Sequence, residues 1–195
     1  MGRRRNKNKV FSNLEVIDAG AKGKTIAKAP DGKVIFLPNA VPGDVVDVQT
    51  FKQRSGYYEG KATVFHKLSD KRTQAACEHF GTCGGCKWQH MDYSHQLFFK
   101  EKEVVNNLKR IGHLELPEIT PILGSKEHYF YRNKMEFSFS DSRWLTLEEI
   151  ASDKDPGDRN ALGFHIPGMW DKILDVKKCW LQADPSNAIR NAVRD

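Results

Sequence analysis

Long apolar stretches are absent from this 195-residue sequence. A membrane-spanning helix needs about 18 or more consecutive apolar residues, and no run approaches that length, so we expect no membrane association. Cysteine is also scarce, with four residues in the chain. The basic start, MGRRRNKNKV, leads into no hydrophobic segment, so we expect no secretory signal and a cytoplasmic location. In that reducing compartment, cysteines serve metal binding or catalysis before disulfides.

Acidic residues are in deficit, but only in the first third of the chain. Residues 1–70 contain 13 Lys and Arg against 7 Asp and Glu, whereas residues 71–195 contain 18 of each. The net charge of +6 is therefore concentrated in one segment. Lys and Arg that neutralise phosphates release condensed counterions, so this segment predicts a nucleic-acid partner. The alternative is that residues 1–12 form only a solvated, disordered basic tail.

Residues 13–70 consist of short β-branched stretches separated by turn signals such as Asp31-Gly32 and Pro42-Gly43. Five short strands of this kind predict a small antiparallel barrel, and such barrels often bind oligonucleotides on an exposed face. The stretch GAKGKT superficially resembles a phosphate-binding loop. That loop requires its first glycine at position 18, which is Asp18 here. We therefore expect GAKGKT to form a hairpin turn.

Residues 71–195 mix helix and strand signals, which predicts a mainly β protein with an α+β second part. Residues 93–112 read as an amphipathic helix, with Leu97, Val104, Leu108 and Ile111 on one apolar stripe. MEFSFS alternates as a half-buried strand does, and two further strands flank a Pro-Gly turn. The helix begun by SNAIRNAVRD has room for about two turns, which is marginal alone. We therefore expect this second domain to be incomplete at its C-terminus.

Three cysteines lie within ten positions, and the fourth follows after 92 intervening residues. The spacing of Cys77, Cys83, Cys86 and Cys179 suits a site of four thiolates, and Gly84-Gly85 permits a tight turn between two of them. Zinc and an iron–sulfur cluster both use such ligands, and inert buried cysteines are the third reading. The nearby His79, His90 and His95 we interpret as surface or packing residues.

The segment CEHFGTCGGCKWQHMDYSHQLFFK resembles the cysteine segment of the iron–sulfur class of RNA (uracil-5-)-methyltransferases. YFYRNKMEFSF and LGFHIPGMWDKILDVKKC are similar to the two strands that follow it in that family, and LPNAVPGDVVDV is similar to a step of its TRAM domain, an RNA-binding barrel. The resemblance covers essentially the whole chain. It implies that Cys77, Cys83, Cys86 and Cys179 ligate a [4Fe–4S] cluster, which air can destroy.

The resemblance also implies what the chain lacks. Family members carry their S-adenosylmethionine site and catalytic residues on a C-terminal Rossmann-like domain. No glycine-rich strand–turn–helix occurs here, and no cysteine remains for attack on uracil once four bind the cluster. We therefore assign no catalytic residue and expect the chain alone to be inactive. The implied partner is structured RNA, ribosomal before transfer, bound by a monomer. The competing hypothesis is a freestanding RNA-binding module with a structural zinc site.

Two groups of residues are candidate RNA contacts. Cations can hold phosphates, and aromatic rings beside them can stack on unpaired bases. The N-terminal group is Arg3, Arg4, Arg5, Lys7, Lys22, Lys24, Lys52, Arg54, Tyr57 and Tyr58. The second group lies where a strand is expected to begin, and the resemblance places it near the substrate. It consists of Tyr131, Arg132, Asn133 and Lys134.

Overall fold

The computed structural model describes residues 8–152 and 155–195. Four members of the predicted RNA-contacting set, Arg3, Arg4, Arg5 and Lys7, lie outside the described residues. The chain forms two compact units. The barrel unit contains Met1–Gln74 and Lys87–Gly124, and the cysteine unit contains Ala75–Cys86 and Ser125–Asp195. Residues 87–124, which we had placed in the second domain, thus group with the barrel; the domain limits at 13–70 and 71–195 stay a prediction.

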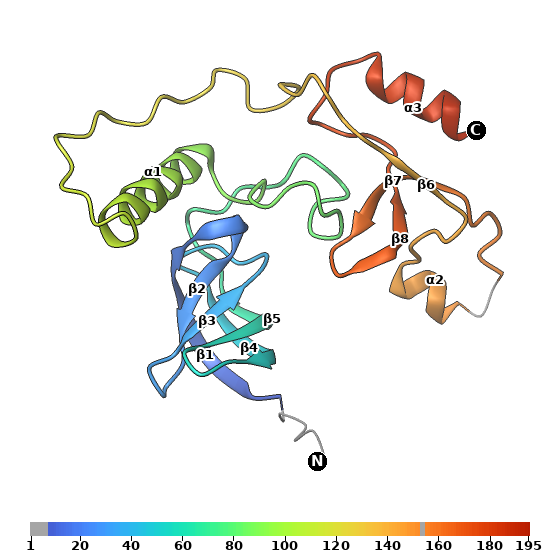
Figure 1. Ribbon diagram of the computed structural model, residues 1–195. Coiled ribbons are helices and arrows are strands. Elements are labelled where there is room, and N and C mark those ends of the chain that lie inside the picture. Colours follow the sequence, from blue (N-terminus) through green and yellow to red (C-terminus); the bar gives the residue numbers. More distant parts are fainter. Residues whose placement is uncertain (1–7, 153–154) are drawn as a thin grey trace. The chain divides into compact units, whose positions relative to one another are not determined.

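Five strands close into a barrel in the order β1-β2-β3-β5-β4, as Figure 1 shows in blue to green. All pairings are antiparallel except β3 with β5, which is parallel. The turn predicted for GAKGKT is a single 3-10 turn, Ala21–Gly23, between the first two strands. The five strands are β1 (Val10–Ala19), β2 (Thr25–Lys28), β3 (Val34–Leu37), β4 (Val45–Gln53) and β5 (Tyr57–Lys67).

The barrel core contains small and β-branched side chains with one large aromatic ring. Period-two alternation places Val46 and Val48 of β4 inside, fully buried with Ile35 and Leu37 of β3. Tyr58 is also fully buried, and its hydroxyl donates to Asp31 at 2.7 Å. The barrel predicted from the sequence is confirmed.

A buried carboxylate fixes the start of β4 to the chain that follows β5. Asp44 is completely buried and accepts two hydrogen bonds from Arg72, at 2.8 and 2.7 Å. Its oxygens also accept from the backbone N–H groups of Val41 at 2.7 Å and Ser69 at 2.9 Å. Gly43 precedes it at φ +101°, and a Cβ there would lie 2.7 Å from the Ser69 hydroxyl. The step VPGD therefore needs glycine for both conformation and space.

Helix α1 (Tyr93–Arg110) lies in the barrel unit, and its start is capped by Asp92, which accepts from the Ser94 N–H at 2.9 Å. The helix itself was predicted correctly, but its buried face was not. Phe99 is the residue it buries, together with Met91, Trp88, Val41 and Ala19.

The expected apolar stripe of α1 is largely solvent-exposed. Val104 is 56% exposed and Ile111 75% exposed, while Leu97 contacts the segment at Gly124. The stripe holds only four apolar side chains, and a single aromatic ring on another face buries more surface than any of them.

The cysteine unit is built on a three-stranded sheet in the order β6-β7-β8, seen in orange in Figure 1. The expected hairpin around Pro167-Gly168 is present. The strand expected over MEFSFS is shorter than predicted: Met135 and Phe137 pack on the core around Cys179, but Phe139 is 67% exposed. The elements are β6 (Ser138–Ser140), α2 (Leu147–Ala151), β7 (Ala161–Ile166), β8 (Met169–Asp175) and α3 (Ser186–Arg194).

The fold class predicted from the sequence, a small barrel followed by an α+β part, is confirmed. Across the described ranges, none of the helices combines the length and apolarity that crossing a bilayer demands.

Asp44→Ala should destabilise the barrel unit by about 3–5 kcal/mol, because it leaves a partly buried guanidinium and two backbone N–H groups without their acceptor. The measurement is chemical denaturation at neutral pH. Asp70→Ala is the matched control, since the Asp70 side chain is 89% exposed and its pair with Lys71 is a surface ion pair. Equal effects of the two substitutions would contradict the role given to Asp44.

The folding stability of wild type and that of Asp44→Ala should depend differently on pH. Burial alone would raise the pKa of Asp44, but the hydrogen bonds from Arg72, Ser69 and Val41 outweigh it and hold the pKa below its usual range. Because its pKa is lower in the folded state, ionised Asp44 stabilises the fold at pH values above the unfolded-state pKa of about 3.9. This stabilisation is lost as the pH falls through the folded-state pKa. The stability gap between wild type and Asp44→Ala should therefore narrow below about pH 4.

Candidate cysteine centre and nucleic-acid interface

The loop that carries three cysteines is a series of tight turns. The Cys83 N–H donates to the His79 carbonyl at 2.8 Å, and the Gly85 N–H reaches the Cys83 sulfur at 3.4 Å. Gly84 packs against the turn between β7 and β8, where an added Cβ would lie 3.2 Å from the His165 carbonyl oxygen. Gly84 thus allows the cysteine loop to pack closely on this turn.

All four cysteines lie in the cysteine unit. Cys179 is 8% exposed and packs in one cluster with Cys86. Burial raises the pKa of Cys77 and of Cys83, and the negative charges that the other cysteines would carry raise both further. Cysteines up to 102 positions apart in sequence thus lie in one compact unit, and their assignment to one metal site stays a prediction.

The donor set is purely sulfur, which fits zinc or an iron–sulfur cluster. The raised pKa values of Cys77 and Cys83 favour their protonated thiols, so a bound metal would be needed to hold these two as thiolates. Within residues 8–152 and 155–195, no three Cys, His, Asp or Glu side chains lie in an arrangement that could hold an ion. The chemistry of the donors fits such a group, and its binding stays a prediction.

The backbone of Cys179 is held by helix α3. The Asn187 side chain accepts from the Cys179 N–H at 2.8 Å and donates to the Cys179 carbonyl at 3.0 Å. One turn later Arg190, 4% exposed, donates to the carbonyls of Val176 and Lys177. We call Asn187 and Arg190 the α3 clamp. Neither residue was predicted from the sequence, whose only signal there is a pair of polar residues three positions apart in a short helix.

The three histidines near the cysteines do not act alike. His79 lies in the cysteine unit, where its ring accepts from the Lys177 N–H at 2.9 Å, and burial lowers its pKa. His90 is buried in the barrel unit, and His95 lies on α1 3.7 Å from Asp92. His79 therefore ties the cysteine loop to the residues that precede Cys179, which is the packing role expected from the sequence.

The barrel presents some of the predicted RNA contacts to solvent. Lys22 and Arg54 are exposed, at the turn before β2 and after β4. Lys24 and Lys52 both pair with Glu59, whose pKa they lower. Two cations around one carboxylate leave a net positive charge, so this part of the surface still suits a polyanion.

The two predicted stacking tyrosines differ. The Tyr57 ring is partly exposed and lies edge-on to Phe36, with ring centroids 5.5 Å apart. Tyr58 is fully buried, and its hydroxyl also accepts from Lys9 at 2.8 Å. A buried ring has no free face, so the structure leaves no room for the base stacking predicted for Tyr58. Alternation along β5 makes this inevitable, because neighbouring side chains point to opposite faces.

The second predicted group lies in the cysteine unit and is exposed. Tyr131 is 56% exposed, and the Arg132 N–H donates to the Leu181 carbonyl at 2.8 Å. The Asn133 carbonyl accepts from Gln182 at 3.3 Å, while Lys134 pairs with Glu136 at the surface. Residues 130–133 thus run beside residues 180–182, which brings YFYRNK next to Cys179.

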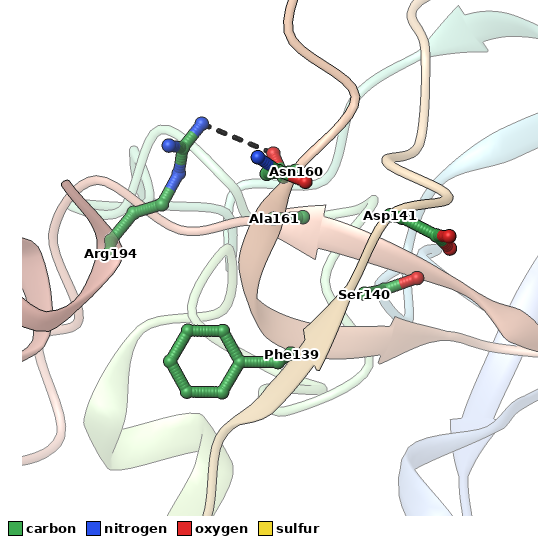
Figure 2. Close-up of a pocket in the computed structure, with 6 residues that line it drawn as sticks. All are labelled: Phe139, Ser140, Asp141, Asn160, Ala161 and Arg194. Carbon is green, nitrogen blue, oxygen red and sulfur yellow. Dashed lines mark hydrogen bonds between the residues drawn. The ribbon is translucent and has the colours of Figure 1, made fainter.

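A shallow pocket of about 300 Å³ opens between β6, the start of β7 and α3 (Figure 2). Its cation, Arg194, donates to the Asn160 carbonyl at 3.1 Å and pairs with Asp158 at 2.6 Å and Asp175 at 3.2 Å. With its charge already matched, Arg194 has little capacity for a further anion. No cysteine is among the residues that line this pocket, and we assign it no site.

The chain is similar to a known domain family and to several RNA methyltransferases. Residues 13–63 match the TRAM domain family. An uncharacterized RNA methyltransferase of Bacteroides thetaiotaomicron is 57% identical over 175 residues, which are 90% of this chain and 38% of that protein. A 23S rRNA (uracil(1939)-C(5))-methyltransferase of Francisella tularensis subsp. novicida is 38% identical over 69% of this chain and 30% of that protein.

Among solved structures, the Pyrococcus abyssi tRNA (uracil-54, C5)-methyltransferase in complex with S-adenosyl-L-homocysteine has a similar fold. Its TM-score is 0.53 at 23% identity, covering 92% of this chain and 35% of that one. The chain therefore spans well under half the length of the curated relatives it matches.

Asn187→Ala should lower the free energy of unfolding by about 1–3 kcal/mol, because it leaves the buried N–H and carbonyl of Cys179 unpaired. Thermal or chemical denaturation measures this. The matched control is Asn191→Ala, one turn later on the same helix, where an exposed side chain makes a single 3.5 Å contact with the Lys177 carbonyl. The control should change stability by less than about 0.5 kcal/mol. A control as damaging as Asn187→Ala would refute the clamp.

Proposed function

Because this chain contains a TRAM domain and is homologous over most of its length to proteins named as RNA methyltransferases, we propose that it forms the RNA-binding and cysteine-bearing part of an RNA (uracil-5-)-methyltransferase. The observation that carries the proposal is the 57% identity over 90% of the chain, together with a closed barrel at the TRAM position. Methylation, its substrate and its cofactor are proposed for the complete enzyme.

The 195 residues alone should not methylate RNA. Methylation of uracil at C5 needs a nucleophile that adds to C6, a base that removes the C5 proton and a methyl donor. We assign all four cysteines to the metal, so none remains as the nucleophile. S-adenosylmethionine would be bound by residues outside this sequence. The contribution of the chain would be to bind and orient RNA.

We assign a [4Fe–4S] cluster to Cys77, Cys83, Cys86 and Cys179. When bound, the cluster supplies four metal–sulfur bonds and no part of methyl transfer. Neighbouring side chains hold the cysteine-bearing segments in place. His79 accepts a hydrogen bond from the Lys177 N–H, and the α3 clamp fixes the backbone of Cys179. Its function would be structural, fastening the loop of residues 77–86 to the region that follows β8.

For the substrate we favour ribosomal over transfer RNA. The relative whose printed name gives a 23S rRNA uracil is 38% identical, whereas the tRNA enzyme of known structure is 23% identical. The exposed cations of the barrel would hold backbone phosphates, and the YFYRNK segment would lie against unpaired nucleotides. We place the protein in the cytoplasm and expect it to act as a monomer.

A zinc-binding RNA module is the second candidate. The observation that favours it is the four-sulfur donor set, which structural zinc also uses. The two candidates share the barrel and differ in the metal, so the metal content separates them.

Protein purified without oxygen should contain roughly four iron atoms per chain and a broad absorption band near about 400 nm, as expected of a cubane cluster. Cys179→Ser should lose the iron, because it removes the fourth ligand. It should also lower the melting temperature, because the cluster then no longer fastens residues 77–86 to the region after β8. Asn191→Ala should keep both. A colourless wild type with one zinc would favour the module, and a Cys179→Ser protein with normal iron would refute the ligand assignment.

Binding of an rRNA stem–loop should weaken steeply with salt, since cation–phosphate contacts release counterions. Replacing Lys22 and Arg54 together by Gln should lower affinity and reduce the slope of log K against log salt by about 2, one for each cation removed. Lys109→Gln combined with Arg110→Gln, at the exposed end of α1, controls for the loss of two charges in the same unit. An unchanged slope in the double variant would exclude these residues as phosphate contacts.

A further inference from the structure

An aromatic stack lies directly beside Cys179, built by residues 50 positions apart in sequence. The rings of Phe130 and Trp180 are stacked, with centroids 5.5 Å apart and an interplanar angle of 29°. Tyr129 meets Trp180 edge-on at the same centroid distance. Backbone pairing holds the two segments together, since the Phe130 N–H donates to the Trp180 carbonyl at 2.8 Å. We call Tyr129, Phe130 and Trp180 the aromatic platform.

The platform is partly open to solvent and has a cation over the face of one of its rings. Phe130 is 42% exposed, and the neighbouring Tyr131 is 56% exposed. The Lys178 ammonium lies 4.2 Å from the centre of the Trp180 ring, while Arg132 follows two positions after Phe130 and is exposed. An exposed ring flanked by cations is the arrangement with which proteins stack unpaired bases and hold the adjoining phosphates.

The backbone of Phe130 is strained, which is unusual for an aromatic residue. Its φ is +57°, in the left-handed region where glycine or asparagine costs far less. Such a conformation persists only where the surroundings impose it, and it concentrates at functional sites. Glycine would satisfy this backbone at lower cost, so the ring itself must serve a purpose. The exposure of that ring argues against a purpose in the core.

We propose that the aromatic platform binds an unpaired base of single-stranded RNA, which stacks on the exposed side of Phe130 while Lys178 and Arg132 neutralise the flanking phosphates. The inference rests on the proposed RNA-binding function and adds a specific subsite to it. The ligand is defined by its chemistry: a flat π face joined to a polyanionic backbone. A duplex does not qualify, because its bases are already stacked and paired.

The test compares two RNA probes on the 195-residue chain. One is a single-stranded RNA of about 12 nucleotides, within the site size of single-strand binders, and the other has the same backbone with abasic sites in its centre. The variant is Phe130→Gly, which suits the positive φ and removes only the ring. Trp170→Ala is the matched control, because Trp170 is an 84% exposed aromatic residue on β8 of the same unit.

Phe130→Gly should bind the intact RNA about 5- to 100-fold more weakly, the range for loss of one stacked base, and the abasic RNA within about 2-fold of wild type. Its melting temperature should equal or exceed that of wild type, because backbone strain is relieved. Trp180→Leu should reproduce the loss for intact RNA. Trp170→Ala should bind both probes as wild type does.

The possible failures are distinguishable. Intact RNA bound equally well by wild type and Phe130→Gly would overturn the subsite and leave the proposed function standing. An equal loss for intact and abasic RNA would also overturn it, since the contact would then be to the backbone. If wild type binds neither probe nor an rRNA stem–loop, the proposed RNA-binding function itself fails.

Discussion

The buried carboxylate of Asp44 is the constraint on which the barrel unit depends. It joins the start of β4 to Ser69 and Arg72, which follow β5. Arg72 in turn forms a bridge with Met91, and the Thr73 and Asp92 N–H groups donate across the same junction at 3.0 and 2.9 Å. The residues on either side of the cysteine loop are therefore paired with each other at the rim of the barrel. One ion pair thus fixes both the barrel and the base from which the loop departs.

Much of the fold was predictable because its signals are local. Period-two alternation and the glycine turns identified the barrel, and the Pro167-Gly168 turn identified the β7–β8 hairpin. Burial was harder to predict, because it depends on what each face meets. The α1 stripe with Val104 is exposed while Phe99 is buried, and Tyr58 lies inside the barrel beside a partly exposed Tyr57. Neither outcome follows from hydrophobicity alone.

The candidate site could likewise be predicted from the sequence only in part. The spacing of the cysteines predicts a shared metal site, and the structure places all four in one unit with Cys86 packed against Cys179. The residues that support them carry no comparable signal. Asn187 and Arg190 act through backbone carbonyls and an N–H of residues 176–179, and any short helix could have held such side chains. Trp180 and Phe130 become neighbours only through tertiary pairing, so sequence inspection singled out Tyr131 and passed over the stack beside it.

The cysteine unit is discontinuous in sequence, and this has a consequence for its biosynthesis. The chain passes between the two units at residues 74/75, 86/87 and 124/125, so the loop of residues 75–86 is made long before the rest of its unit. At translation rates of about 5–20 residues per second, the 93 positions between Cys86 and Cys179 correspond to a delay of roughly 5–20 s. Throughout that interval three thiols are present without the fourth and without the α3 clamp. The barrel strands, complete by Lys67, can fold on the ribosome, whereas the cysteine unit must assemble afterwards and receive any metal last.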